Sequence, residues 1–401
     1  MNEVTSGWTA DAEAILPDLV TLRRAIHVEP ELGLQNPKTL AKIKAALAGL
    51  PLEFREGPST TGLIAILRGS DNGRTVLLRG DMDALPLHED TGLDYASTTD
   101  GAMHACGHDT HVAMLVGAAR LLSAKRDTLA GTVMFMFQPG EEGHHGARFM
   151  LDDGLIDPLP DAAFALHIMP NAPHGIFTGR AGPLLASADK LHMTVTGRGG
   201  HASMPHDALD PVPIACEIVT AIQTMVTRKV SVFDPAVVTI GRILAGTTDN
   251  IIPETASLLG TIRTLSPRQR EAVATELKRL GPGIAAAHGA SAEVRIDQGF
   301  PVTICDGRAV AFGQLVIEDL FGAAAWRTLD APIMGAEDFA YVLEKVPGAM
   351  FFLGVAPQGD NWASCCGIHS TRMMIDEGAM PIGSALLAAL GERFLAEGFA
   401  A

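Results

Sequence analysis

Continuous apolar runs bounded by polar turns alternate along this chain with longer segments in which apolar residues recur every three or four positions. Thr132–Phe137 and Ala162–Ile168 are runs of the first kind, and residues 110–124 are of the second kind, which is typical of a helix. Strands that are apolar at nearly every position are buried on both faces, which favours a sheet covered by helices. We therefore expect an α/β fold with helices on both faces of the sheet.

Two local features near the N-terminus predict particular elements. Residues 10–27 predict one amphipathic helix, because apolar side chains repeat along one face: Ile15, Leu19, Leu22 and Ile26. The apolar runs Thr61–Leu67 and Thr75–Leu78 are separated by the turn sequence Ser-Asp-Asn-Gly at 70–73. This arrangement predicts a β-hairpin.

The pattern changes at Gly182-Pro183, after which Lys190–Thr196 alternates apolar and polar residues, as a strand with one solvated face does. The order that follows is helix, strand, strand, helix, strand, which resembles a compact, ferredoxin-like α+β domain with an antiparallel sheet. These elements are expected near 214–225, 236–243, 256–263, 266–280 and 292–297. After Gln298 the earlier pattern resumes. We therefore expect residues 1–184 and 298–401 to form one domain and residues 185–297 to form a second domain inserted into it.

Composition and charge argue against several classes of function. Thirty Lys and Arg against 46 Asp and Glu give a net charge of −16, and only 5% of residues are aromatic, which disfavours nucleic acid. No apolar run reaches the ~18–20 residues that span a bilayer, and the first residues do not resemble a signal peptide. The five cysteines are too sparse in so long a chain for a disulfide framework. We expect a cytoplasmic protein that binds neither nucleic acid nor membrane.

Polar residues follow four of the expected strands. Arg79–Asp83 and Gln138–Gly143 each come directly after an apolar run, His167 closes another, and Cys365–His369 lies beyond the run Ala349–Leu353. Open α/β sheets bind ligands outside the carboxyl ends of their strands. We therefore expect these distant segments to converge on one rim of the sheet.

The segment Met103–His111 is the densest in reactive side chains. Cys106 and His108 flank Gly107, so a tight turn can direct a thiolate and an imidazole at one point. Side chains from the other segments would complete a set of sulfur, nitrogen and oxygen ligands suited to a divalent metal: Glu141 or Glu142, His167 and His369.

The residues leave two alternatives open. Cys106 could instead be a thiol nucleophile with His108 or His111 as its base, although nearby carboxylates would raise the thiol pKa unless a metal intervened. Asp81 and Asp83 point the same way on an extended strand. They could ligate and orient a metal site or form an ordinary turn, and their spacing does not decide between the two.

Two loops in the expected inserted domain carry polar side chains. Gly197–Ser203 is a glycine-rich turn that presents His201, but it lacks the Lys-Ser/Thr ending of a phosphate-binding loop. Thr247–Pro253 is a polar loop in which Asn250 is available as a hydrogen-bond donor. Each loop by itself is an ordinary turn.

Taken in order, these segments resemble the M20 metallopeptidase family. The similarity is to its amidohydrolase branch, which includes hippurate hydrolases, N-acyl-amino-acid deacylases and auxin-conjugate hydrolases. It extends over nearly the whole chain. The matching segments are Leu22–His27 with Pro30–Gly33, Gly80–Pro86, His104–Asp109, Gln138–Gly143, Gly199–Ser203, Asn250–Pro253 and Gly335–Phe339.

The resemblance implies a role for particular positions. Two divalent metal ions (manganese, zinc, nickel or cobalt) would be held by five side chains: Cys106, His108, Glu142, His167 and His369. Glu141 would be the general base and acid, and Asp83 a supporting acid. Asp81 is less certain, because related branches have a His ligand there. His201 would stabilise the oxyanion, often from the neighbouring subunit, and Asn250 would help to hold the substrate.

The resemblance also implies an activity and an assembly. The expected activity is hydrolysis of the amide bond of an N-acyl or N-aroyl amino acid, such as a hippurate-type or N-acetyl substrate. A dipeptidase or carboxypeptidase is the alternative within this class, and a non-catalytic binding protein is the alternative outside it. The inserted domain would be a lid and dimerisation domain of a homodimer or homotetramer. The chain departs from the family pattern at Cys365-Cys366 and at Ser370–Glu377, which borders the expected substrate pocket.

Overall fold

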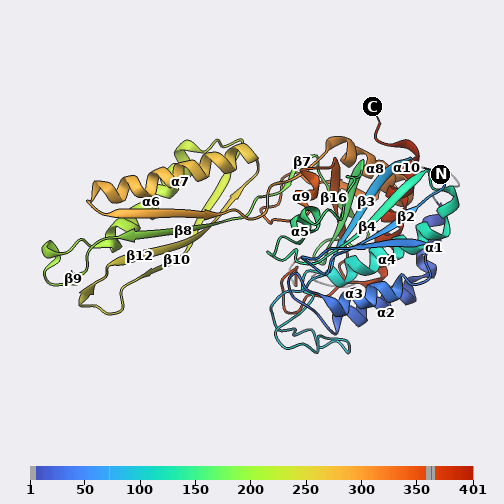
Figure 1. Ribbon diagram of the computed structural model, residues 1–401, viewed down its shortest axis with the longest axis horizontal. Coiled ribbons are helices and arrows are strands. Elements are labelled where there is room, and N and C mark those ends of the chain that lie inside the picture. Colours follow the sequence, from blue (N-terminus) through green and yellow to red (C-terminus); the bar gives the residue numbers. More distant parts are fainter. Residues whose placement is uncertain (1–5, 72, 358–362, 364–365, 401) are drawn as a thin grey trace. The chain divides into compact units, whose positions relative to one another are not determined.

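The computed structural model describes residues 6–71, 73–357, 363 and 366–400. The chain divides into two compact units. The larger unit comprises Met1–Leu184, Ile304–Ala331 and Asp338–Ala401, and the inserted unit comprises Leu185–Thr303 and Pro332–Glu337 (Figure 1).

The larger unit is built on an eight-stranded sheet with the order β1-β2-β4-β3-β5-β16-β6-β15. Its four central strands run parallel, and they are buried along most of their length. The α/β class expected from the apolar runs is confirmed. The strands are β1 (Leu52–Glu56), β2 (Leu63–Arg68), β3 (Arg74–Asp81), β4 (Gly131–Gln138), β5 (Ala162–Met169), β6 (Phe177–Gly179), β15 (Trp326–Thr328) and β16 (Gly348–Gly354).

The expected hairpin between β2 and β3 is wrong. The chain does reverse between them, but β4 lies between the two strands, antiparallel to β2 and parallel to β3. A turn sequence can reverse the direction of the chain, but it does not determine which strand lies next to the following one in the sheet. Because β3 is buried from Val76 to Asp81, it needs a strand on each side, and β4 and β5 supply them.

The helices of the larger unit lie along this sheet (Figure 1). The single helix expected at 10–27 is two helices, which meet at Ile15, and Pro17 occupies the first turn of the second, where proline is tolerated. The helices are α1 (Ser6–Ala14), α2 (Leu16–His27), α3 (Pro37–Ala46), α4 (His108–Ala124), α5 (Gly146–Asp152), α8 (Gly307–Phe321), α9 (Ala340–Leu343) and α10 (Met380–Glu397), with short 3-10 turns at 126–128, 323–325 and 377–379.

One helical segment of the described chain, Glu377–Glu397, is long and apolar enough to cross a membrane by length and composition, but 78% of that window is buried inside the protein. It contains α10, which packs against α1, α4 and β3. It is a core helix of the larger unit.

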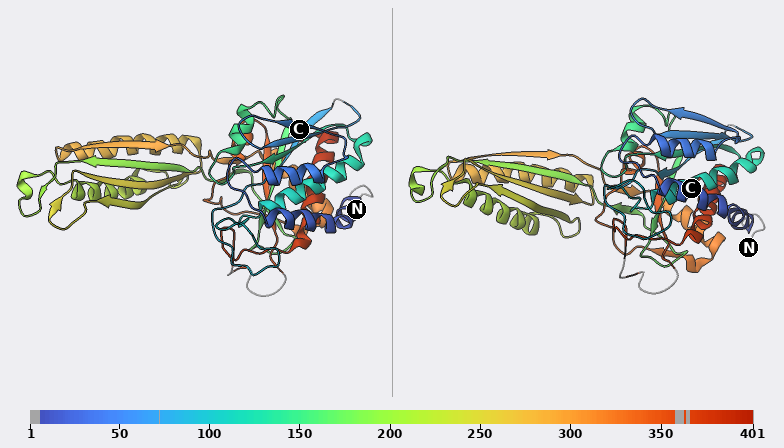
Figure 2. Two further views of the ribbon diagram at one scale, coloured as in Figure 1. Left: turned by 60° about the horizontal axis from the view of Figure 1, so that its bottom comes forward. Right: turned by 90° about the horizontal axis from the view of Figure 1, so that it is seen from below.

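The inserted unit is a sheet with two helices on one face, and Figure 2 shows these as two layers. The sheet is antiparallel, with the order β10-β12-β8-β13. Its elements are β8 (Asp189–Thr196), α6 (Pro211–Lys229), β10 (Ala236–Ala245), β12 (Thr255–Thr264), α7 (Pro267–Ala287) and β13 (Ser291–Asp297), with a 3-10 turn at 205–207. A two-stranded pair in this unit joins β9 (Gly200–His201) to β11 (Ile251–Ile252). A second pair, of β7 (Gly182–Leu185) and β14 (Thr303–Cys305), lies where the chain passes from one unit to the other.

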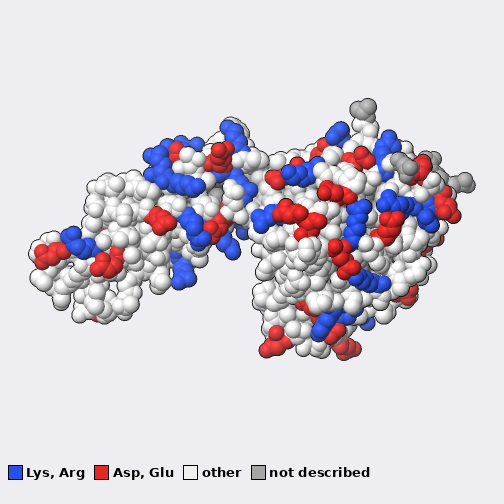
Figure 3. Space-filling model, in the orientation of Figure 1, with Lys and Arg blue, Asp and Glu red and all other residues white. Residues whose placement is uncertain are grey.

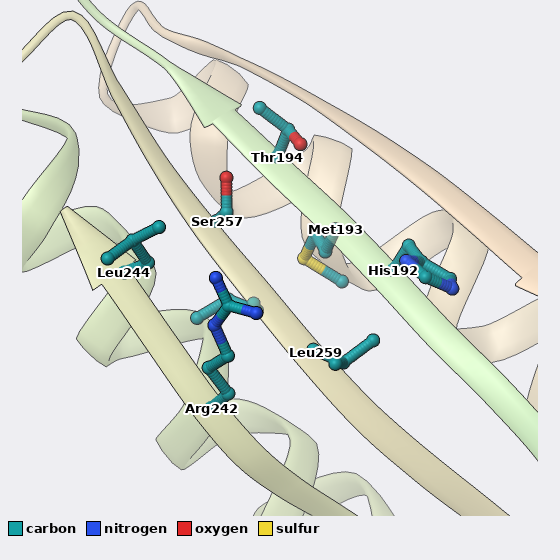
Figure 4. A pocket seen from close by; sticks show the side chains of 8 residues that line it. His192, Met193, Thr194, Arg242, Leu244, Ser257 and Leu259 are labelled. Atoms are coloured by element: carbon teal, nitrogen blue, oxygen red, sulfur yellow. The ribbon is translucent and has the colours of Figure 1, made fainter.

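The alternation of residues in β8 explains the two faces of this sheet. Leu191, Met193 and Val195 are buried in the core beneath the helices, whereas His192 and Thr194 face outward. Across the outer face lies a shallow hollow of about 310 Å³, bordered also by Arg242 of β10 (Figure 4). Over the visible face of the larger unit, Lys and Arg are interspersed with Asp and Glu (Figure 3).

Candidate metal centre

The carboxyl ends of β3, β4 and β5 bring the polar segments of the larger unit together. β3 ends at Asp81, the turn that carries Glu141 and Glu142 follows β4, and His167 lies near the end of β5. Cys106 lies just before α4, and His108 is the first residue of α4. The loop after β16 supplies His369, whose backbone N–H donates to the carbonyl of Ala105 at 2.7 Å.

The five expected metal ligands lie within reach of one another. Their ligand atoms form overlapping groups in which all atoms are within 4.8 Å: Cys106, His108 and His167; Cys106, Glu142 and His369; His108, Glu141 and Glu142. The Cys106 Sγ lies 3.3 Å from the His167 Nε2. The Glu142 Oε1 lies 3.5 Å from the His369 Nε2 and 3.9 Å from the His108 Nε2.

Two atoms at the centre of this group have ring nitrogens or carboxylate oxygens of other ligands nearby but make no hydrogen bond of good geometry with the described residues. They are the His108 Nε2 and the Glu142 Oε1, and both are buried. Buried polar atoms without partners are costly and therefore uncommon. Thiolate, imidazole and carboxylate together are also the donor set of divalent transition metals. The residues present therefore fit a bound metal.

Hydrogen bonds to the outer ring nitrogens orient two of the imidazoles. The His108 Nδ1 lies 2.8 Å from the backbone carbonyl of Asp83, and the His167 Nδ1 lies 2.6 Å from that of Ile168. A carbonyl can only accept, so each Nδ1 carries a proton, and in the neutral imidazole each Nε2 has a lone pair that faces the other ligands.

Glycine at position 107 allows the turn that presents Cys106 and His108. Its φ is +85°, and a Cβ there would lie 2.4 Å from the Ile168 Cδ1. Only glycine adopts this conformation without strain and leaves room for that side chain.

Asp83 supports the turn that carries the two glutamates. Its Oδ1 accepts from the backbone N–H of Glu141 at 2.9 Å, and its Oδ2 accepts from that of Glu142 at 3.1 Å. Both oxygens are therefore engaged with the backbone. Asp83 therefore holds the backbone of the turn that carries Glu141, which is itself 7% exposed.

Asp81 is engaged by two other side chains. Its carboxylate accepts from the Arg79 Nη1 at 2.6 Å and from the His111 Nδ1 at 2.5 Å. Sequence reasoning considered His111 only as a base for a cysteine nucleophile. The available signal was its position three residues after His108 on α4, which places both imidazoles on one side of the helix.

The pKa shifts argue against the cysteine-nucleophile alternative. Burial raises the pKa of the Cys106 thiol, although His108 and His369 act in the opposite direction. A nucleophilic cysteine requires a lowered pKa. The nearby Cys106 thiol and Glu142 carboxylate raise the pKa of His369 to about 10. Binding of a cation would therefore displace protons from this group.

A buried ion-pair network lies next to these ligands. Asp109 accepts from the Arg23 Nε at 2.7 Å and lies 2.8 Å from the His27 Nδ1, and both partners are on α2. The network ties α2 to the first turn of α4, directly after His108. It explains the buried polar residues in the Leu22–His27 motif, which sequence reasoning matched without assigning them a role.

His201 and Asn250 lie together in the inserted unit. His201 pairs with Ile251 across the β9–β11 ladder, and the Ala202 N–H donates to the carbonyl of Asn250 at 3.1 Å. The His201 Nδ1 accepts from the backbone N–H of Ser203 at 3.2 Å and lies 2.8 Å from its hydroxyl. The Nε2 of this exposed side chain therefore carries the proton and is a donor.

The unusual loop before His369 is described in part. Cys365 lies outside the described residues. Cys366 forms a disulfide, whereas Cys106, Cys216 and Cys305 have free thiols.

Comparison with known proteins identifies relatives that cover more than nine tenths of the chain. The family model described as peptidase family M20/M25/M40 matches residues 77–393. An N-acetylcysteine deacetylase of Bacillus subtilis is 38% identical, with 93% of this chain and 95% of the relative covered. Thermostable carboxypeptidase 1 of Saccharolobus solfataricus is 36% identical, with 96% and 97% covered.

The fold is shared with a solved structure of a metal-binding protein. It is a dinuclear metal-binding peptidase from the M20 family of Bacillus subtilis, 34% identical, with a TM-score of 0.82 and coverage of 96% of this chain and 99% of that one. The family model and these relatives cover the segments that carry the clustered thiol, imidazole and carboxylate groups. The chain therefore belongs to peptidase family M20/M25/M40 and is a metal-dependent amidohydrolase.

Proposed function

We propose that this enzyme hydrolyses the amide bond of N-acyl or N-aroyl amino acids, with hippurate-type and N-acetyl amino acids as the first candidates. The observation that carries the proposal is the position of Glu141. It is buried, its backbone is held by Asp83, and its carboxylate lies within 4.8 Å of the ligand atoms of His108 and Glu142. The similarity to an N-acetylcysteine deacetylase supports an N-acyl amino acid substrate.

We propose that two divalent ions are held by Cys106, His108, Glu142, His167 and His369. A thiolate ligand favours the softer ions among manganese, zinc, nickel and cobalt. Such ions, when bound, supply Lewis acidity that polarises the amide carbonyl and lowers the pKa of a water molecule.

Different side chains would transfer protons and stabilise the negative charge that develops during the reaction. Glu141 accepts the proton of the attacking water and donates it to the departing amine, because a carboxylate held beside both groups can serve first as base and then as acid. The His201 Nε2–H would donate a hydrogen bond to the oxyanion of the tetrahedral intermediate. Asn250, on the same ladder, would hold the substrate.

The substrate proposal is tested by a product-release assay over a panel of substrates. Protein stripped with a chelator receives Mn²⁺, Zn²⁺, Ni²⁺ or Co²⁺ one at a time, and release of the free amino acid is measured for hippurate, N-acetyl amino acids and dipeptides. We expect restored turnover that is fastest on N-acyl or N-aroyl amino acids. Turnover of none of them with any metal would overturn the proposal.

A peptidase acting on short peptides is the second candidate, because a thermostable carboxypeptidase is 36% identical to this chain. The same panel separates the two activities, since this alternative predicts that dipeptides are cleaved faster than N-acetyl amino acids. A non-catalytic binding protein is disfavoured, because binding alone has no need of a carboxylate such as Glu141 next to the ligands.

We also propose that the inserted unit is a lid and dimerisation domain of a homodimer or homotetramer. Its edge strand β10 exposes apolar side chains at Val237, Ile243 and Leu244. An edge strand leaves backbone donors and acceptors unpaired, so a second copy can cover both these groups and the apolar side chains.

A further inference from the structure

His111 lies between two of the expected ligands without being one of them. Its ring centroid is 4.6 Å from that of His167 and 5.4 Å from that of His108. The residue is 2% exposed, so its ring is enclosed. Its position against both imidazoles raises the question of whether it binds a metal, transfers protons or holds its neighbours in place.

Both ring nitrogens of His111 are already engaged. The Nε2 accepts the backbone N–H of Ile168 at 2.9 Å. A backbone amide can only donate, so Nε2 is unprotonated and the proton is on Nδ1, which donates it to the Asp81 Oδ1 at 2.5 Å. His111 could therefore ligate a metal or accept a proton only by breaking one of these buried hydrogen bonds.

The ligand atoms of Asp81, His108 and His111 also lie within 4.8 Å of one another, which by distance alone could suggest a further metal site. Asp81 is bound to Arg79 as well as to His111. Because Asp81 and His111 are hydrogen-bonded to each other and also to Arg79 and the Ile168 N–H, respectively, the cluster is better explained as a support.

The hydrogen bonds of His111 connect three elements around the ligands. Asp81 ends β3, His111 belongs to α4, and Ile168 lies in β5 directly after His167. The Ile168 N–H is held by His111, and the Ile168 carbonyl is held by the Nδ1 of His167. The peptide N–H directly after His167 is thus held by an imidazole of the same helix as His108, and the next carbonyl is held by His167 itself.

We propose that His111 is a positioning residue that sets the placement of the His167 imidazole relative to that of His108 and so determines the affinity of the centre for divalent cations. This inference rests on the proposed metal centre and adds to it a residue that binds no metal. Residues that orient metal ligands typically contribute 10- to 100-fold to metal affinity.

Three substitutions separate the two hydrogen bonds from the packing. His111→Phe keeps a ring between the ligands and removes both hydrogen bonds. The amide of His111→Gln reaches the place of Nε2 and can accept from Ile168, whereas the amide of His111→Asn reaches the place of Nδ1 and can donate to Asp81. Leu122→Ala, at another buried position on α4, is the control for loss of stability without loss of either hydrogen bond.

The readout is the affinity of chelator-stripped protein for Mn²⁺ and for Zn²⁺, measured by calorimetric titration, with the Tm of the metal-free protein measured in parallel. We expect His111→Phe to weaken binding of both ions 10- to 100-fold. His111→Gln should recover more affinity than His111→Asn, because it retains the contact next to His167. Leu122→Ala should lower the Tm and leave metal affinity within twofold of wild type.

Three results would contradict the inference. Wild-type affinity in His111→Phe would show that the residue serves the fold alone. An equal loss of affinity in Leu122→Ala would attribute the effect to general destabilisation. Failure of the wild-type protein to bind either ion would overturn the metal centre itself, and the positioning role with it.

Discussion

Glu141 is the side chain that most directly links the geometry to hydrolysis. Glu141→Gln retains the size of the side chain and its ability to hydrogen-bond, but an amide cannot take a proton from water. We expect kcat to fall by about 10²- to 10⁴-fold, the usual contribution of a general base, with metal content unchanged. Steady-state kinetics and metal analysis of the purified variant measure both quantities.

The neighbouring glutamate provides the matched control for that experiment. Glu142→Gln should lose metal, because the Glu142 Oε1 lies 3.5 Å from the His369 Nε2 and 3.9 Å from the His108 Nε2, where a shared cation would bind. If Glu141→Gln retained more than a tenth of wild-type turnover, the proposed base would be wrong.

His104 makes folding sensitive to acid. Burial lowers its pKa to about 3 from the usual 6.5, and neither ring nitrogen has a hydrogen-bond partner among the described residues. Between these two pH values the unfolded chain binds a proton at this position that the folded chain does not. The free energy of unfolding should therefore decrease as the pH falls through this window, by up to about 1.4 kcal/mol per pH unit.

His104→Phe removes this proton uptake. Urea denaturation of metal-free protein at pH 7 and pH 5 should show a smaller loss of stability for the variant than for wild type. Equal losses in the two proteins would show that the folded and unfolded forms of His104 titrate alike.

A substitution at His201 tests whether the inserted unit contributes a side chain to catalysis. His201→Ala removes the proposed oxyanion donor, for which the usual cost is about 10²- to 10³-fold in kcat. Metal content should not change, because none of the expected ligands belongs to that unit. Loss of metal in this variant would mean that the histidine has been assigned the wrong role.

The junction between the Cys106 loop and α4 depends on the conformation of Gly107. In Gly107→Ala, a Cβ would clash with the Ile168 Cδ1 at 2.4 Å and the φ of +85° would be strained. We expect metal affinity to fall at least tenfold, as for other groups that position ligands. Gly101→Ala is the control, since it has a φ of +71° and nothing within 4 Å. In Gly101→Ala the free energy of unfolding should fall by about 1–2 kcal/mol from backbone strain, with no loss of metal affinity. Equal metal affinities in the two variants would contradict this account of Gly107.

The ends of the strands were predictable from the sequence, whereas the hydrogen bonds that hold the site residues in place were not. Apolar runs identified β4 and β5, so the convergence of Glu142 and His167 followed from the rule that parallel strands share a carboxyl edge. The resemblance implied a supporting acid at Asp83, but the groups that Asp83 and His111 hold depend on which backbone N–H lies opposite each side chain. That pairing forms only when β3, β4 and β5 are in register, and no sequence pattern encodes it.

For the strands, the local pattern was predictable from the sequence, whereas the neighbouring strand in the sheet was not. The alternation in β8 predicted a strand with one solvated face, and the structure has that strand. The neighbour of β3 was predicted wrongly, because β4 comes from a segment far along the chain. A local turn sequence contains no information about such a partner.

Association of two chains through β10 would depend on the apolar side chains that this edge strand exposes. Ile243→Lys places a charge on its exposed edge, and Leu159→Lys places one at an exposed position of the larger unit. We expect light scattering to give wild type and Leu159→Lys a mass of at least twice the 42.1 kDa of one chain, and to give Ile243→Lys the mass of a monomer. A wild-type monomer, or an oligomeric Ile243→Lys, would contradict association through this strand.

The positions of bound cations decide whether the five clustered side chains form a metal centre. Crystals of the protein loaded with Mn²⁺, measured for anomalous scattering, should show two peaks per chain, each within coordination distance of some of five side chains: Cys106, His108, Glu142, His167 and His369. Peaks at other residues, or no peak within reach of these side chains, would contradict the account.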